Sequence, residues 1–167
     1  MAKSGQLSAD FTVPNWVKFT LIIVAAFQSL GSLQMVPLLF LDDPAPLGNT
    51  PKDLLIKSVI VLSPIVAIAG LAFAIKGQIA RAVMAIAGVS TLDWIGYIPS
   101  FAVDPSGLWD FPGPFLFFVV PACAPVALVL AWLRKWPRLA IVLALTPWAV
   151  RAIMVAVFAG SVAIYGF

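Results

Sequence analysis

The sequence contains no histidine and no glutamate, a single cysteine, and few charged residues of any kind. Haem ligation, zinc sites and cysteine redox pairs need clusters of those residue types, so we predict no cofactor and no metal site. General acid–base chemistry would fall on Asp93 or Tyr97 alone. A carboxylate that is already engaged by an arginine is also a weak base. We therefore predict that the protein is not an enzyme.

Charge is scarce because the chain is overwhelmingly apolar. Hydrophobic residues make up 62% of the 167 residues and charged residues 10%, whereas soluble domains average about 25% charged. This composition predicts an integral membrane protein, a single helical domain over residues 1–167 whose main partner is the lipid bilayer. The net charge of +3 does not indicate nucleic-acid binding, because the basic residues cluster beside apolar segments and report topology instead.

Long apolar runs, separated by short segments rich in proline and charge, predict an all-α bundle of five transmembrane helices. The predicted spans are Val17–Leu41, Leu54–Ile75, Ile79–Phe101, Phe115–Leu133 and Leu139–Tyr165. The segments 42–53 and 103–114 are predicted loops, since their prolines and aspartates do not suit a regular helix in hydrocarbon.

With five crossings, the predicted loops alternate between the two sides of the membrane. Seven basic residues fall on the side of the N-terminus and two on the other, with Arg151 counted in neither set. The larger set is Lys3, Lys18, Lys76, Arg81, Arg134, Lys135 and Arg138, and the smaller set is Lys52 and Lys57. Because cytoplasmic loops carry the excess of lysine and arginine, this bias predicts a cytoplasmic N-terminus, an external C-terminus and a location in the cytoplasmic (inner) membrane.

A polar stripe runs along the third predicted span. At about 100° per residue, its four side chains fall within a sector of roughly 80° on one helix face. They are Ser90, Asp93, Tyr97 and Ser100. In hydrocarbon these groups would have no hydrogen-bond partners, so the stripe must face protein or water. Asp93 is also the only acidic residue inside a predicted span.

Asp93 and Arg151 are the two ionisable residues that lie well inside predicted spans. At about 1.5 Å per residue, both lie roughly 18–20 Å beyond the nearest basic residue that precedes them on the same helix. A lone charge near mid-membrane costs at least about 2.5–3.5 kcal/mol, and pairing in a bidentate geometry offsets much of that cost. We therefore predict an interhelical ion pair supported by Ser90 and Tyr97, either as a structural clamp or as part of a ligand pocket or pathway.

Each of these two charges also has an alternative partner. Lys57, near the end of the second predicted span, is the other candidate for Asp93. Arg151 could instead meet another subunit or a lipid phosphate. A second polar group, Gln28, Ser29 and Ser32, shares one side of the first predicted span. Small and amide side chains in such positions favour helix–helix packing, with the lining of a pathway as the alternative.

These features favour two classes of function. Small size, short loops and the missing catalytic residue types favour a non-catalytic subunit or assembly factor of a larger membrane complex, with other membrane subunits or a second copy as partners. The polar stripe, a proline in every span and the predicted pair favour a small transporter, channel or ligand-binding membrane protein. The sequence ranks the complex subunit first. A lone bundle with a wet or ligand-filled cavity at Asp93 would favour the second class.

Overall fold

Helices and turns make up the whole of the described chain. The computed structural model describes residues 13–40, 50–103 and 115–166, and within these ranges there is no strand. The helices in chain order are α1 (Asn15–Met35) with the short 3-10 helix η1 (Val36–Leu39), α2 (Pro51–Ile75), α3 (Ile79–Val103), the π-helical turn η3 (Phe115–Val119) leading into α4 (Val120–Trp132), and α5 (Pro137–Tyr165).

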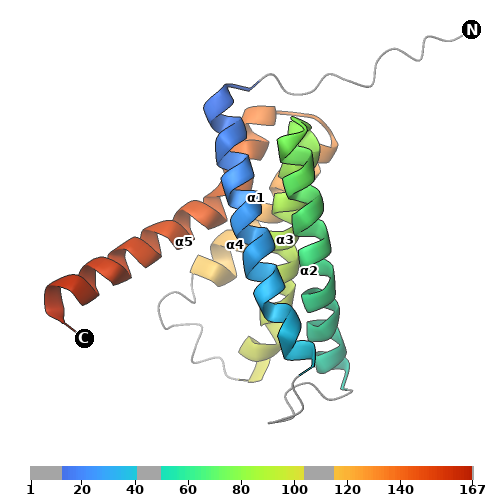
Figure 1. Cartoon of the computed structure of the whole chain (residues 1–167). Coiled ribbons are helices and arrows are strands. Elements are labelled where there is room, and N and C mark those ends of the chain that lie inside the picture. The colour runs from blue at the N-terminus through green and yellow to red at the C-terminus, as the bar shows by residue number, and fades with distance from the viewer. Residues whose placement is uncertain (1–12, 41–49, 104–114, 167) are drawn as a thin grey trace, which may run out of the picture.

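The bundle is built around α3. This helix packs along α2 and α4 and also contacts α1 and α5 (Figure 1). Its first half is rich in alanine, which lets neighbouring backbones approach closely. A methyl group placed on Gly70 of α2 would come within 2.9 Å of the Ala85 side chain of α3, so glycine is required at this crossing. The second half of α5 leaves the bundle, as Figure 1 shows.

The turns between α2 and α3 and between α4 and α5 lie at the same end of the bundle as the start of α1 (Figure 1). The first turn closes on Gly77, whose φ of +74° suits glycine, while Gln78 N–H donates to the Phe73 carbonyl. The Lys18 ammonium lies next to this glycine. We call this end, with residues 76–81 and 134–138, the basic end; it gathers six of the seven basic residues predicted for one side of the membrane, and the seventh, Lys3, lies outside the described residues.

Within the described residues, four helices are long and apolar enough to cross a membrane: Asn15–Leu39, Pro51–Ile75, Ile79–Pro99 and Pro137–Ile164. The chain is thus a helical protein with the features of a multi-pass membrane protein. Their bounds differ by a few residues from the predicted spans. At α2 the cause is local: Thr50 and Asp53 form a reciprocal capping box that starts this helix at Pro51 instead of Leu54.

The predicted fourth span, Phe115–Leu133, is the element that differs from expectation. The apolar helix there, Phe117–Trp132, is shorter than the four spanning helices of the described chain. Pro121 and Pro125 explain the irregularity, because each lacks the amide hydrogen that a regular helix bonds to the carbonyl four residues earlier. The π-helical turn η3 precedes them, and Phe117 of this turn packs against Trp94 of α3 with ring centres 6.3 Å apart.

Candidate functional site

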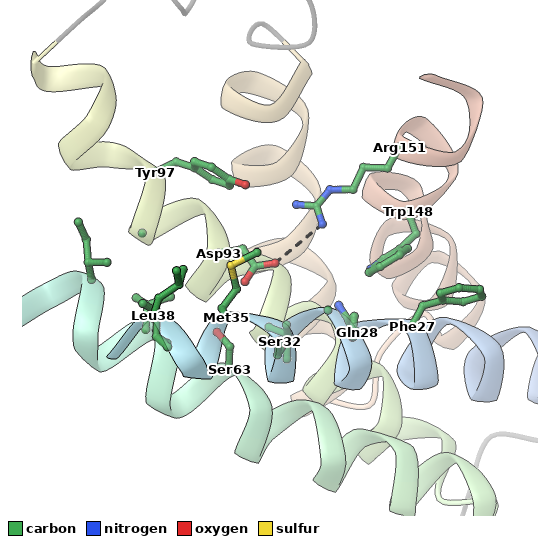
Figure 2. A pocket seen from close by; sticks show the side chains of 16 residues that line it. Phe27, Gln28, Ser32, Met35, Leu38, Ser63, Asp93, Tyr97, Trp148 and Arg151 are labelled. Carbon is green, nitrogen blue, oxygen red and sulfur yellow. Dashed lines mark ion pairs between the residues drawn. The ribbon is translucent and has the colours of Figure 1, made fainter. Parts of the chain in front are cut away.

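A cavity of about 410 Å³ lies among α1, α2, α3 and α5, in the half of the bundle away from the basic end (Figure 2). Its wall is mostly apolar. The apolar lining residues include Met35, Leu38, Ile56, Val59, Ile60 and Val89. The polar lining residues are Gln28, Ser32, Ser63, Asp93, Tyr97, Trp148 and Arg151. A volume of this size and a mainly apolar wall with a few polar groups are typical of small-molecule sites.

The two charged side chains of the cavity wall come from different helices. Arg151 reaches from α5 toward Asp93 on α3 (Figure 2), and its Nη1 atom lies 3.9 Å from Asp93 Oδ2. This is a charge–charge contact, longer than the roughly 2.7–2.9 Å of a charge-assisted hydrogen bond, and it is not the bidentate geometry that the sequence analysis favoured. Each side chain keeps 30% of its surface exposed. The pair therefore leaves both charges open to a further partner.

A neighbouring residue on the same helix also positions Arg151. Its guanidinium lies over the ring of Trp148, 5.6 Å from the ring centre, one turn earlier on α5. Stacking of this kind orients the planar guanidinium without using its N–H donors. The arrangement directs Arg151 into the cavity from the α5 side.

Gln28 joins α1 to α3 beside the cavity. It is 4% exposed, and its side-chain nitrogen donates to the Ile86 carbonyl at 3.1 Å and to the Ser90 hydroxyl at 3.4 Å. A backbone carbonyl can only accept, which fixes the amide nitrogen on that side. The Gln28 Oε1 atom has no hydrogen-bond partner within the described chain. It is therefore a buried acceptor with spare capacity in the cavity wall.

One further polar atom of the wall shares this property. Trp148 Nε1 on α5 is buried and lacks a hydrogen-bond partner within the described ranges, whereas the Ser63 hydroxyl on α2 has the Asp93 carboxylate as its neighbour. Ser63 is 4% exposed and lies next to Asp93 (Figure 2). A buried polar group without a partner costs roughly 1–3 kcal/mol, and such groups are few in native proteins. Two of them, Gln28 Oε1 and Trp148 Nε1, belong to side chains that line this cavity, and a third buried atom of this kind, Trp94 Nε1, lies away from it.

The predicted site residues fall into two groups. Asp93, Tyr97, Arg151, Gln28 and Ser32 all line the cavity. Ser90 and Ser29 lie away from its wall. Ser90 is buried against Gln28, and Ser29 donates to the Ala25 carbonyl of its own helix at 2.8 Å. Ser100 belongs to α3, but its side chain lies outside the described residues.

The lining residues that sequence reasoning missed include Phe27, Ser63 and Trp148. Ser63 directly precedes Pro64, a position that indicates a bend in the helix more readily than a site. Trp148 lies one turn before Arg151, and this spacing was the available signal, since residues three apart on a helix are neighbours. Within the described residues, no group of three His, Cys, Asp or Glu side chains is placed to hold a metal ion.

The donors and the acceptors of the cavity wall come from different helices. Arg151 and Trp148 Nε1 donate from α5, while Asp93 and Gln28 Oε1 accept from α3 and α1. Such a wall can hold a ligand that has both an accepting and a donating end. Comparison of the chain with protein-family models, curated proteins and solved structures found no match, so the function has to be argued from this site.

Proposed function

We propose that this protein is a small, non-catalytic membrane protein that binds a polar small molecule in the cavity around Asp93 and Arg151. The observation that carries the proposal is the cavity wall, where an open charge pair lies beside two buried polar atoms, Gln28 Oε1 and Trp148 Nε1, that have no partner in the described chain. A bundle stabilised only by packing has no use for these groups. We therefore rank ligand binding, with or without transport, above the complex-subunit interpretation that the sequence favoured.

Binding is preferred to catalysis because of the residue types in the wall. Asp93 and Tyr97 are its acid–base side chains, and Asp93 is already engaged by Arg151. The serines of the wall lack a neighbouring histidine, since the chain has none. An activated nucleophile needs such a base or an equivalent group.

The complex-subunit function remains a second candidate, and one observation favours it. Beyond Arg151, the apolar side chains of α5 are between 61% and 70% exposed at Ile153, Val155, Val157 and Phe158. This part of α5 extends away from the other helices (Figure 1). A helix that leaves its own bundle is well placed to pack against another membrane subunit or a second copy of the chain.

We further propose that α4 completes five crossings, with the basic end in the cytoplasm of a cell with an inner membrane. The gathering of basic residues at one end supports this orientation. A reporter fused after Phe167 should then be active only outside, and one inserted between Arg134 and Arg138 only in the cytoplasm. Activity of both on the same side would exclude five crossings.

Native mass spectrometry of protein purified in mild detergent tests the binding function. The wild type should carry a small-molecule adduct that is lost in Arg151→Gln and kept in Arg138→Gln, a control that removes an exposed arginine at the basic end of the same helix. Protein that carries no small-molecule adduct and copurifies with a stoichiometric protein partner would instead favour the complex-subunit function.

A further inference from the structure

The charges on the cavity wall restrict the chemistry of its guest. Among the described residues that line the cavity, Asp93 and Arg151 are the charged ones, and their charges cancel. A purely anionic guest would pair with Arg151 and leave Asp93 without its counter-charge, and a purely cationic guest would do the reverse. Once a guest has displaced the water of the cavity, an unpaired charge beside it is strongly unfavourable. A guest that carries both charges leaves neither residue unpaired.

The positions of the polar groups give such a guest an orientation. Its anionic end would face α5, where the Arg151 guanidinium and the Trp148 Nε1 atom donate. Its donating end would face α3 and α1, where the Asp93 carboxylate and Gln28 Oε1 accept, with the Ser63 hydroxyl alongside. The 3.9 Å separation of the pair is already too long for a hydrogen bond, so both residues can turn to the guest at little cost.

The rest of the wall is apolar and selects an apolar body. Aliphatic side chains from α1, η1, α2 and α3 line the cavity below the charge pair. Resting on the proposed binding function, we infer that the ligand is an amphiphilic zwitterion: a primary ammonium and an anionic group on an apolar body. Two sources offer this chemistry, a free amino acid with an apolar side chain and the headgroup of an aminophospholipid from the bilayer.

The first arm of the test uses the wild-type protein in detergent and unfolding followed by tryptophan fluorescence. Leucine and phenylalanine are compared with analogues that lack one of the two charged groups, which we call their halves. The analogues 4-methylpentanoate and 3-phenylpropanoate lack the ammonium, and 3-methylbutylamine and 2-phenylethylamine lack the carboxylate. A ligand that binds the folded state raises the midpoint, and at a fixed concentration the rise is larger for a ligand of higher affinity. We expect an amino acid to bind about tenfold or more tightly than either half, as one charged hydrogen bond contributes.

The second arm uses lipid nanodiscs that contain phosphatidylethanolamine, phosphatidylcholine or phosphatidylglycerol. Phosphatidylethanolamine alone combines an N–H donor with an anion, since choline has no N–H and glycerol no positive charge. Stabilisation by phosphatidylethanolamine alone, without a response to amino acids, assigns the lipid headgroup as the source. A response to amino acids assigns the free ligand. The inference is overturned if a singly charged half or phosphatidylglycerol stabilises as much as the zwitterion, or if neither arm responds.

A substitution at Asp93 tests which residue binds the donating end of the ligand. Asp93→Asn should remove the advantage of the zwitterion over its carboxylate half, whereas Asp53→Asn, outside the cavity in the first turn of α2, should keep it. If Asp93→Asn does not fold, the wild-type comparison still decides. A small-molecule adduct in the native mass spectrum without a response in either arm would refute the zwitterion and leave the binding function standing. If the adduct and the response to ligands are both absent, the zwitterion and the binding function are both refuted.

Discussion

The two halves of the bundle use opposite kinds of packing. Near the basic end, small and branched apolar side chains from all five helices fill the interior, and Leu21, Val83 and Ile86 are completely buried. In the other half, the same helices α1, α2 and α3 enclose a cavity with a charge pair and buried polar atoms that lack partners in the described chain. We call these the packed half and the cavity half.

This difference separates what stabilises the fold from what serves its function. In lipid, helices associate through close packing, because the hydrocarbon around them is as apolar as their side chains. The packed half provides such contacts through the apolar side chains of its core. The cavity half has the charge pair of Asp93 and Arg151 in place of such contacts, and an ionisable residue inside a membrane is by default a hypothesis for a functional site. The packed half thus acts as the scaffold for the site.

The largest effect is expected from filling the crossing of α2 and α3 in the packed half. Gly70→Leu would drive a side chain into Ala85, which lies 2.9 Å from the position of even the first added carbon. Overpacking of this kind costs about 1–3 kcal/mol or more, so the thermal midpoint in detergent should fall sharply. Gly160→Leu is the matched control, because nothing lies within 4 Å of that position. Equal midpoints for the two variants would contradict the close crossing.

An intermediate effect is expected from the charge pair. Asp93→Asn and Arg151→Ala should each destabilise, and the double variant should lose less than the sum, because each single change leaves the other charge without its partner. With 30% of each side chain exposed, we expect a coupling of about 0.5–2 kcal/mol, as for polar contacts between membrane helices. Strictly additive losses would mean that the two charges do not interact. Stable variants that lose binding would make the pair functional instead of structural.

Most of the helical fold could be predicted from the sequence, because apolar runs and charged turns depend on local composition. The bounds of α3 and α5 lie within two residues of the predicted spans. The regularity of α4 could not be predicted as well, since two prolines act against an otherwise apolar run. In the site, Asp93 and Arg151 stood out because charge is rare in a span. Ser63 and Trp148 did not, since their role depends on which helix faces which.

The smallest effect is expected from Gln28, which belongs to both halves. Gln28→Leu removes the bonds to Ile86 and Ser90 but also an acceptor that has no partner in the described chain. The two changes partly cancel, so we expect a loss of no more than about 1 kcal/mol in thermal unfolding. Gln34→Leu, at an exposed position of the same helix, is the control and should be near neutral. A loss several times larger would mean that Gln28 is chiefly a structural clamp.

The central claim is that the cavity half is a polar site open to water, while the packed half is closed. Cysteine labelling tests it most directly, in a Cys123→Ala background that removes the native thiol. Single cysteines are placed on α1 at Ser32 in the cavity wall, at the fully buried Ala25 and at the outward-facing Ile23. A water-soluble methanethiosulfonate is then applied to protein in lipid nanodiscs, because it reacts with the thiolate that forms in water.

The account predicts rapid labelling at Ser32→Cys and slow labelling at Ala25→Cys and Ile23→Cys until the protein is denatured. Circular dichroism and the thermal midpoint of each variant would confirm that it is folded before labelling. Labelling of Ser32→Cys as slow as that of the other two would contradict the claim, because the cavity would then be closed to water and to any polar ligand.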